Sequence, residues 1–265
     1  MSRFPLAILV FFMSFMTAGL GLAQQPQAPA RVTFRMGVGY DQGDFGTGET
    51  SRAAYLPVSA RFAANRFDLT VSSSLARIDT SEGVRLIDGV PTQTGDGVPL
   101  QESGIGDTIV RSRFFVWENA DANLPSVTPF VRVKIPTARE ELGLGTGKTD
   151  VGVGIEVDKV LPQLFLFADV GYTVVGKVPG LDLRNRTTAG FGVGKDLSES
   201  TTISGMLDWR SAIVAGNPNP AEFTGVLSYK LTPTVTLSPN GFVGLTSGSS
   251  DFGVGLQMSF RFGRF

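Results

Sequence analysis

The 265-residue sequence contains no cysteine and no histidine. Without cysteine, the chain has no disulfide framework, no thiol nucleophile and no lipid-anchored N-terminal cysteine. Without histidine, it lacks the usual general base and the commonest metal ligand, which excludes Ser-His-Asp hydrolase chemistry. Neither sign of charge dominates, because 23 basic side chains nearly balance 24 acidic ones. We therefore predict no catalytic residues, no cofactor, no metal site and no nucleic-acid partner.

A long apolar run occurs only near the N-terminus, where Arg3 precedes the apolar stretch 4–20. Gly21-Leu22-Ala23 then forms a small-x-small cleavage site. We predict a secretory signal peptide over residues 1–23, a linker over 24–30 and a single barrel domain over 31–265. The alternative is an uncleaved anchor helix, since the run is nearly long enough to span a bilayer. The cleavage site and the soft linker favour removal.

Glycine and phenylalanine are abundant, with 33 and 20 residues, and apolar side chains alternate with small or polar ones over long stretches. The last stretch, 251–262, has a column from Phe252 to Phe262 of apolar side chains and a second column of glycine, amide, hydroxyl and guanidinium groups. Alternating columns face opposite sides of a β-strand. Twelve such strands are predicted: 31–42, 53–63, 67–79, 107–117, 127–137, 149–160, 164–176, 183–196, 202–215, 221–231, 234–246 and 251–262.

The connections between these strands also alternate between mostly short and mostly longer ones, such as 64–66 and 80–106. This parity is typical of an up-and-down barrel with short periplasmic turns and longer outer loops. An even strand count places both ends on the periplasmic side. We predict an all-β, transmembrane, antiparallel up-and-down β-barrel. A soluble lipid-binding barrel would place the apolar column inside, but twelve closed strands could not bury so many bulky side chains, so the apolar column faces lipid.

Charged residues occur in the polar column, which then faces the lumen. The residues predicted to line the lumen and set its selectivity are Arg111, Arg113, Arg132, Lys134, Asp169, Arg184, Arg186, Asp208, Arg210 and Lys230. Rings of basic side chains can make a pore attract anions. Alternatively, Arg111, Arg113 or Arg132 could form salt bridges with Asp68, Asp107, Glu156, Asp158 or Asp169 that fill the lumen. Because basic groups outnumber acidic ones in this column, a basic-biased pore is slightly favoured.

Aromatic residues at strand ends are candidates for anchoring the barrel at the membrane interfaces. These are Trp117, Tyr172, Trp209, Tyr229, Phe260 and Phe262. The final strand is expected to end at Phe262, because Phe265 is out of phase with the apolar column. Pro57, Pro129 and Pro239 fall within strands, where each removes a backbone donor, and are expected at bulges or strand ends.

Two loops contain features of other sites. The stretch 143–149 resembles a phosphate loop, but its spacing departs from that pattern and no helix follows, so a flexible outer loop is favoured. The loop 80–106 could fold inward as a gate, bind an external partner or remain a mobile outer loop. Its carboxylates Asp88, Asp96 and Glu102 do not have the spacing of a calcium loop.

Several short motifs in the middle of the chain indicate a family. They are Gly104-Ile105-Gly106-Asp107 before a strand, Lys134-Ile135-Pro136-Thr137 at a strand end and Gly145-Thr146-Gly147-Lys148-Thr149-Asp150 in the following loop. Over about 104–176 the chain resembles the outer-membrane transporter-like family labelled as meta-pathway phenol degradation proteins. The resemblance implies a barrel in the outer membrane of a Gram-negative cell that passes small aromatic or other hydrophobic molecules.

We therefore predict a channel for passive passage of small molecules through a basic-biased lumen. The alternative is a non-conducting barrel with a structural or surface-binding role. The expected partners are outer-membrane lipid, a small-molecule solute and the barrel assembly machinery.

Overall fold

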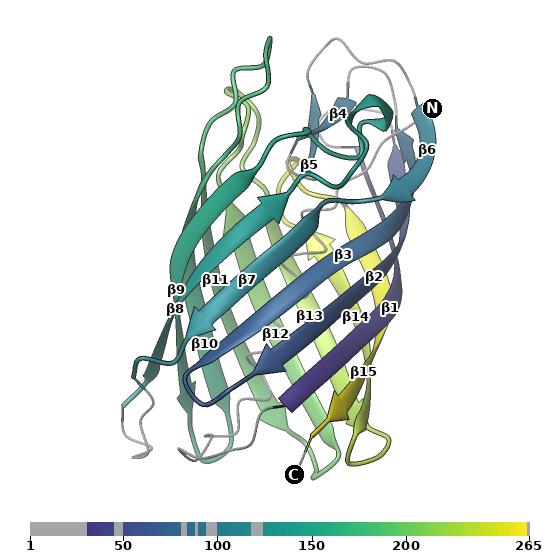
Figure 1. The fold of residues 1–265 in the computed structure, drawn as a ribbon. Coiled ribbons are helices and arrows are strands. Elements are labelled where there is room, and N and C mark those ends of the chain that lie inside the picture. The colour runs from purple at the N-terminus through teal and green to yellow at the C-terminus, as the bar shows by residue number, and fades with distance from the viewer. Residues whose placement is uncertain are drawn as a thin grey trace.

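A computed structural model describes residues 31–44, 50–80, 84–87, 90–93, 100–117 and 124–263. The predicted signal peptide 1–23 and linker 24–30 lie outside the described residues, as do Arg264 and Phe265. Figure 1 shows strands that tilt around a barrel, with the C-terminal end beside the short turns at the bottom and the longer loops at the top.

The barrel consists of twelve antiparallel strands that close into a ring, which confirms the predicted fold class. One wall strand is formed by two consecutive segments, β6 and β7, which both pair with β3. The bounds are β1 Arg31–Gly43, β2 Ser51–Ala63, β3 Phe67–Thr80, β6 Leu100–Ile105, β7 Thr108–Phe114, β8 Ser126–Ile135, β9 Asp150–Val160, β10 Phe165–Val174, β11 Arg186–Asp196, β12 Thr201–Arg210, β13 Ala221–Lys230, β14 Val235–Gly244 and β15 Phe252–Phe262.

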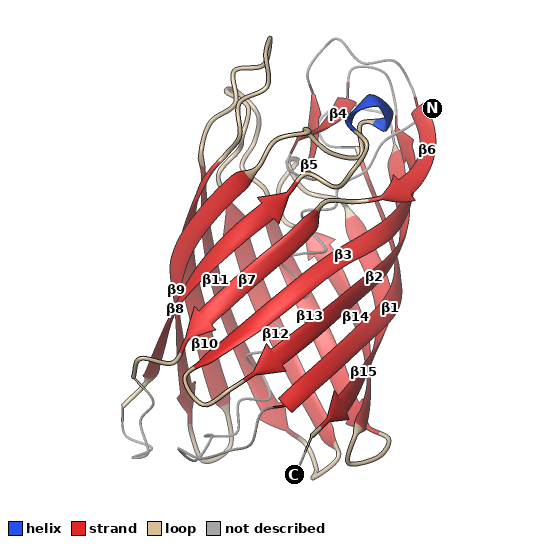
Figure 2. Ribbon diagram, viewed as in Figure 1, coloured by secondary structure: helices blue, strands red, loops and turns tan. Residues whose placement is uncertain are grey.

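Two smaller elements lie at the loop end. The strands β4 (Val84–Ile87) and β5 (Val90–Gln93) pair with each other as a separate two-stranded sheet. The short 3-10 helix η2 (Glu140–Leu142) lies between β8 and β9, and it is drawn in blue in Figure 2. In the described part of the chain, no helix has the length and apolar character needed to cross a membrane.

Ring closure occurs where β1 pairs with β15, with Val32 opposite Phe262 and Gln42 opposite Phe252. This pairing satisfies the backbone groups of the first and last strands, so the wall has no open edge. Closure is the condition for a β-structure in hydrocarbon, where no water is available to unpaired backbone groups.

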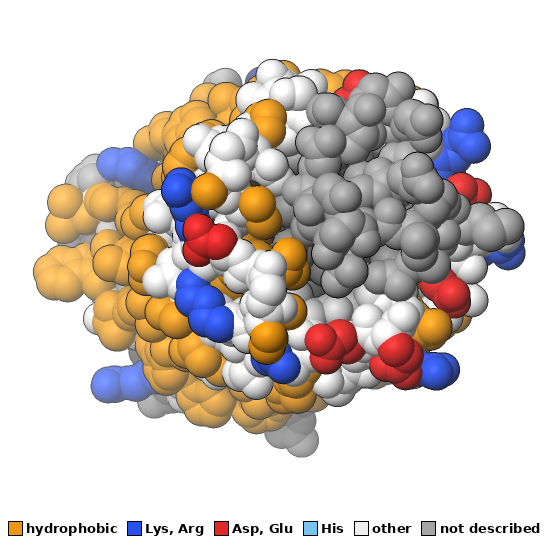
Figure 3. All heavy atoms as spheres, turned by 90° about the horizontal axis from the view of Figure 1, so that it is seen from above, with side chains coloured by type: hydrophobic (Ala, Val, Ile, Leu, Met, Phe, Trp, Pro, Cys, Tyr) orange, Lys and Arg blue, Asp and Glu red, His pale blue; other side chains and the backbone are white. Residues whose placement is uncertain are grey.

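Burial alternates along the strands in the way the sequence pattern predicts. In β9 the even-numbered residues face inward and the odd-numbered ones outward, so Asp150 is fully buried while Val153 is 54% exposed. Seen from the loop end, hydrophobic side chains form much of the outer margin (Figure 3). An exposed band of valine, leucine, isoleucine and phenylalanine around a closed barrel is the surface expected to contact lipid.

Several predicted strand limits are wrong. The strand predicted over 183–196 begins at Arg186, and the one over 202–215 ends at Arg210. The apolar residues that extended both predictions instead pack together in the outer loops, where Val175, Leu183 and Ile213 form a buried cluster. The loop predicted over 80–106 also contains β4, β5 and β6, and pairing with β3 is interrupted between Ile105 of β6 and Ile109 of β7.

The three strand prolines lie where one ladder is interrupted or ends. Pairing of β2 with β1 is interrupted at Pro57, and pairing of β14 with β13 is interrupted at Pro239. Pro129 follows the end of the β7–β8 ladder, whose last pair is Arg113 with Phe130. Proline has no N–H to donate, so pairing is lost with one of the two neighbouring strands at each of these positions. The proline stays paired with the other neighbour, as Pro57 does with Ser74 of β3.

The last strand ends at Phe262, as predicted. The following Gly263 has φ 126°, a backbone conformation that glycine adopts readily and L residues rarely do. The predicted placement of Phe265 lies outside the described residues.

Candidate functional site: the inner wall of the barrel

The inner wall carries most of the predicted lumen residues. Those on the inward-facing side of their strands are Arg111, Arg113, Arg132, Lys134, Asp169, Arg186, Asp208, Arg210 and Lys230. Arg132 and Lys230 are half-buried and the others are buried. Lys230 lies at the turn end, where its Nζ donates a 2.9 Å hydrogen bond to the backbone oxygen of Glu199.

Arg184 is the exception among these residues. It lies outside β11, in the segment that precedes the strand, and its side chain is exposed. The prediction that Arg184 lines the lumen together with Arg186 is therefore wrong. The physical reason is that the buried Leu183 forms an isolated bridge with Val214 in the outer loops, so Arg184 does not continue the alternation of the barrel strand.

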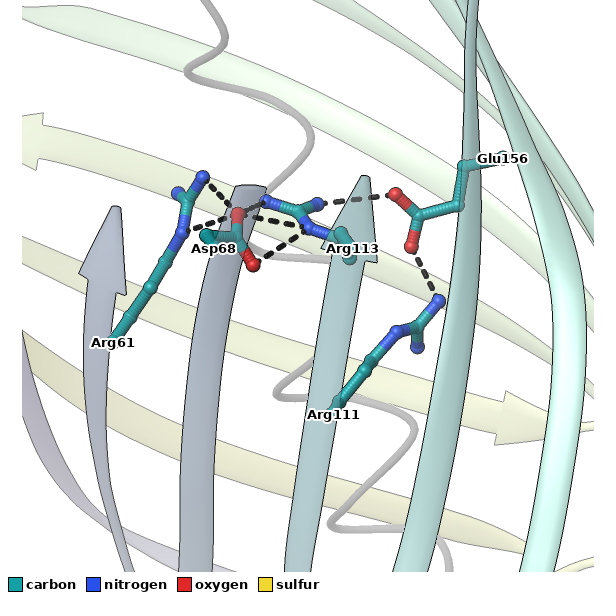
Figure 4. A network of polar contacts seen from close by, with 5 residues as sticks. All are labelled: Arg61, Asp68, Arg111, Arg113 and Glu156. Atoms are coloured by element: carbon teal, nitrogen blue, oxygen red, sulfur yellow. Dashed lines mark hydrogen bonds and ion pairs between the residues drawn. The ribbon is translucent and has the colours of Figure 1, made fainter. Parts of the chain in front are cut away.

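A five-residue ionic network joins side chains from β2, β3, β7 and β9 in the half of the barrel near the turns, and it passes over β8, which lies between β7 and β9 (Figure 4). Asp68 on β3 is fully buried between two arginines, with 2.5 Å from its Oδ2 to Nη2 of Arg61 and 2.5 Å to Nη2 of Arg113. Arg113 also reaches Glu156, with 3.1 Å between Nη1 and Oε2. Glu156 in turn pairs with Arg111. Three guanidinium groups thus share two carboxylates, so the network keeps a positive excess.

The network has the features of a rigid part of the wall. Arg113 donates from both Nε and Nη2 to Asp68, which fixes the plane of the guanidinium. The guanidinium of Arg111 lies 3.8 Å from the centre of the Phe130 ring, a cation–π contact. Of the salt bridges predicted from sequence, the structure forms those of Arg111 with Glu156 and of Arg113 with Asp68 and Glu156.

A second ionic cluster lies at the loop end around Lys134. This side chain is only 2% exposed, and its Nζ lies 2.7 Å from Asp150 Oδ2 and 3.5 Å from Asp107 Oδ2. It also donates a 3.1 Å hydrogen bond to Oγ1 of Thr146. The contact with Asp150 Oδ2 is an ion pair by distance but does not have hydrogen-bond geometry. We call Lys134, Asp107, Thr146 and Asp150 the lysine cluster.

The lysine cluster unites the three motifs found in the sequence. Asp107 Oδ1 accepts a 3.1 Å hydrogen bond from the backbone N–H of Ala138, and Asp150 Oδ1 accepts one of 2.8 Å from that of Gly176. Both carboxylates therefore hold loop backbone as well as the lysine. The motif residues act together to fix the loop that connects β8 with β9.

That loop, 136–149, packs against the inner wall. Ala138 and Leu144 are buried against Ala53 of β2 and Ile78 of β3, in an apolar cluster that also includes Ala76, Tyr55 and Leu142. Tyr55 therefore faces inward. Inward folding was one of three alternatives considered for the loop 80–106, many of whose residues lie outside the described part. The role of 136–149 was missed, although its alternation of glycine with leucine was a visible signal.

Aromatic rings on the inner wall were also missed from the sequence. Phe167 of β10 lies over Gly192 of the neighbouring β11, where an added Cβ would come within 2.1 Å of its ring. Phe165 covers Gly194 in the same way, and Phe130 covers Gly154. The signal is a phenylalanine in phase with the charged column and opposite a glycine, and the pairing of strands had to be known to use it.

Further acidic groups reduce the excess of basic side chains counted from the sequence. Asp41, Asp150 and Glu222 face inward and are buried, yet none was counted in the polar column. Glu222 Oε1 lies 2.7 Å from Arg210 Nη2. In the described residues, no group of three or more His, Cys, Asp or Glu side chains has an arrangement that could hold a metal ion.

The six predicted anchoring aromatics all lie on the outer side, at both ends of the wall. Tyr172 and Trp209 are near the loop end, and Asn185 Nδ2 donates a 2.8 Å hydrogen bond to the Tyr172 hydroxyl. Trp117, Tyr229, Phe260 and Phe262 are near the turns. Membrane barrels carry aromatic girdles at two such levels, and the anchoring role of these side chains stays a prediction.

Comparison with known proteins identifies the family of the chain. The family described as "Putative MetA-pathway of phenol degradation" matches residues 29–262. The chain belongs to this family. This membership confirms the family suggested by the sequence motifs. No curated protein matches the chain.

Solved structures share the fold at low sequence identity. An outer-membrane channel from Pseudomonas putida F1 has a TM-score of 0.66 at 13% identity, covering 91% of this chain and 98% of that one. The NanC porin has a TM-score of 0.58 at 13% identity, covering 86% and 98%. The KdgM porin has a TM-score of 0.55 at 12% identity, covering 88% and 99%. At these identities, the similarities show that this phenol-degradation family member shares the fold of the three barrels.

Proposed function

We propose that this protein is a passive channel for small molecules in the outer membrane of a Gram-negative cell. The main support is that the closed barrel has two different faces. Apolar side chains lie outside, and charged or hydrogen-bonding side chains lie inside. A wall of this kind offers solutes a polar path and offers lipid an apolar surface. The proposal requires no catalytic residue, cofactor or energy input.

Two kinds of comparison support the proposal. The family description refers to phenol degradation, which favours small aromatic compounds as solutes. The folds of a Pseudomonas channel and of two porins show that barrels of this shape are used as channels. Inward phenylalanines such as Phe165 and Phe167 add aromatic surface to the inner wall, which favours an aromatic solute. The lipid contacts and insertion by the barrel assembly machinery belong to the same proposal.

The lumen charge in this proposal is local rather than uniform. Near the turns, the network of Arg61, Arg111 and Arg113 has more guanidinium groups than carboxylates. At the loop end, the single Lys134 faces both Asp107 and Asp150. The basic bias expected from the sequence is therefore assigned to the half of the lumen near the turns.

The second candidate function is a non-conducting structural barrel. One observation favours it, namely that the ionic network links strands from β2 to β9 across the inner wall and could fill the lumen rather than line it. A closed barrel of this kind would serve as a scaffold for the outer loops.

Planar-bilayer recording separates the two functions. The purified mature protein is inserted into a lipid bilayer, and current is measured in potassium chloride. A channel gives discrete conductance steps, and adding phenol or benzoate to one side reduces the current by competition for the lumen. A protein that is folded and inserted but gives no steps would refute the channel and support the structural barrel.

A further inference from the structure

We propose that Arg35 is the centre of a binding site for small organic carboxylates on the inner wall, near the turns. The site deepens the proposed channel function by naming a class of solute, and it can be tested by binding alone. We call Arg35, Ser59, Arg61, Ser259 and Arg261 the arginine site. Its residues come from β1, β2 and β15, next to the seam where the barrel closes.

Arg35 is a buried cation without an ion-pair partner in the described part of the protein. It faces inward from β1, opposite Ser59 of β2 and Ser259 of β15. Its side chain is only 6% exposed, and its buried Nη1 has no hydrogen-bond partner within the ranges that the structure describes. Ser59 is 3% exposed, and its Oγ also lacks a partner. Unsatisfied buried donors are costly, so an acceptor supplied from outside the chain would stabilise this arrangement.

The neighbouring charges favour an anion over a cation or a neutral molecule. The next inward position on β1 is Thr33, which pairs with Arg61 on one side and Arg261 on the other. Adjacent strands are about 5 Å apart and inward positions on one strand about 7 Å apart, within reach of long arginine side chains. The nearby carboxylate Asp68 is already shared by Arg61 and Arg113. The arginine site therefore keeps a positive excess.

The geometry of the donors selects carboxylates among anions. A guanidinium presents parallel N–H groups that match the two oxygens of one carboxylate. The hydroxyls of Ser59 and Ser259 flank Arg35 on its two sides and can donate to the same group. A spherical anion such as chloride satisfies the charge but offers one acceptor atom to the paired donors, where a carboxylate offers two.

Calorimetric titration of the purified mature protein in lipid nanodiscs tests the site. Benzoate at pH 7 is the anionic probe, and benzamide is its neutral counterpart of similar shape. Benzoate should bind the wild type, and Arg35→Gln should weaken that binding about tenfold or more, because a charge-assisted bidentate contact is lost. Arg35→Lys should fall between the two. The matched control is Arg77→Gln, which removes the same charge from an exposed, outward-facing side chain and should bind benzoate like the wild type.

Specific results would overturn the site. Equal benzoate affinity in Arg35→Gln and the wild type would refute it, as would benzamide binding as tightly as benzoate. Chloride and acetate are also tested as competitors of benzoate. If chloride displaces benzoate as well as acetate does, the site attracts anions in general and its selectivity for carboxylates is refuted. If Arg35→Gln does not fold, Ser59→Ala provides the test and should lower benzoate affinity about two- to tenfold, the loss of one neutral donor.

This experiment is separate from the test of the channel. A protein that binds benzoate through Arg35 but gives no conductance steps would refute the channel and keep the site. A protein that conducts but does not bind benzoate would refute the site and keep the channel.

Discussion

At the scale of single residues, the inner wall contains buried charges in two opposite situations. Lys134 has two carboxylates and a hydroxyl as partners. Asp41 is fully buried, and neither of its carboxylate oxygens has a hydrogen-bond partner among the described residues. Breaking a buried ion pair is strongly destabilising, whereas removing an unpaired buried charge relieves a cost. The two residues should therefore respond to neutralisation in opposite directions.

Lys134→Met should destabilise the barrel, because it leaves Asp107 and Asp150 buried without their cation. The expected loss is about 3–5 kcal/mol in the free energy of unfolding. Urea titration of the protein in lipid vesicles, followed by tryptophan fluorescence, measures it. The matched control is Lys195→Met, an exposed lysine, which should change stability by less than about 0.5 kcal/mol. Equal stability of the two variants would show that the lysine cluster is not a structural anchor.

Asp41→Asn should have the opposite effect and stabilise the barrel. The amide keeps the size of the side chain but removes a charge that burial disfavours, so we expect a gain of about 1 kcal/mol or more. The same urea titration measures it, with Asp182→Asn at an exposed loop position as the control. A loss of stability in Asp41→Asn would mean that the carboxylate has a favourable partner in the folded protein.

At the scale of elements, the loop 136–149 is the connection that the structure holds most clearly against the inner wall. The lysine cluster fixes its ends, and Ala138 and Leu144 pack on Ala53 and Ile78. Arg139 lies in the same loop, and its side chain is 67% accessible and pairs with Glu141 at the surface. The packing of Leu144 should therefore control how readily the backbone beside Arg139 is released.

Leu144→Ala should increase trypsin cleavage after Arg139. Removing a buried leucine side chain costs about 2–5 kcal/mol, and here that loss falls on the loop rather than on the strand ladders. The rate of cleavage is followed by electrophoresis of the protein in vesicles, with Leu245→Ala at an exposed position as the control. If Leu144→Ala is cleaved no faster than the control, Leu144 does not hold the loop.

At the scale of the whole molecule, the sequence predicts the barrel well because its pattern is repeated in every strand. Twelve alternating segments, the parity of the connections and the end at Phe262 all follow from side-chain periodicity. The predicted strand limits were wrong where apolar loop residues such as Leu183 and Ile213 continued the alternating pattern without belonging to a strand. Local alternation does not distinguish a strand end from an apolar cluster of loops.

The inner wall was less predictable because it depends on which strands are neighbours. The lysine cluster joins residues from three separate segments, and the rings of Phe165 and Phe167 fit against glycines of the next strand. The balance of charge also changed once the register was known, since Asp41 and Glu222 were found on the inner face. Which charged side chains lack an ion-pair partner depends on which strands are neighbours and on their register, and composition does not give either.

The central claim is that the polar face of the barrel lines a water-filled path while the opposite face contacts lipid. Thr188 and Ala189 are consecutive residues of β11 that face inward and outward, and the native chain has no cysteine to interfere. Single Thr188→Cys and Ala189→Cys variants in vesicles are treated with a charged, membrane-impermeant thiol reagent. We predict that the cysteine at 188 is labelled rapidly and the cysteine at 189 is protected. Protection of both would show that water does not reach the inner wall, and labelling of 189 alone would contradict the orientation of the barrel.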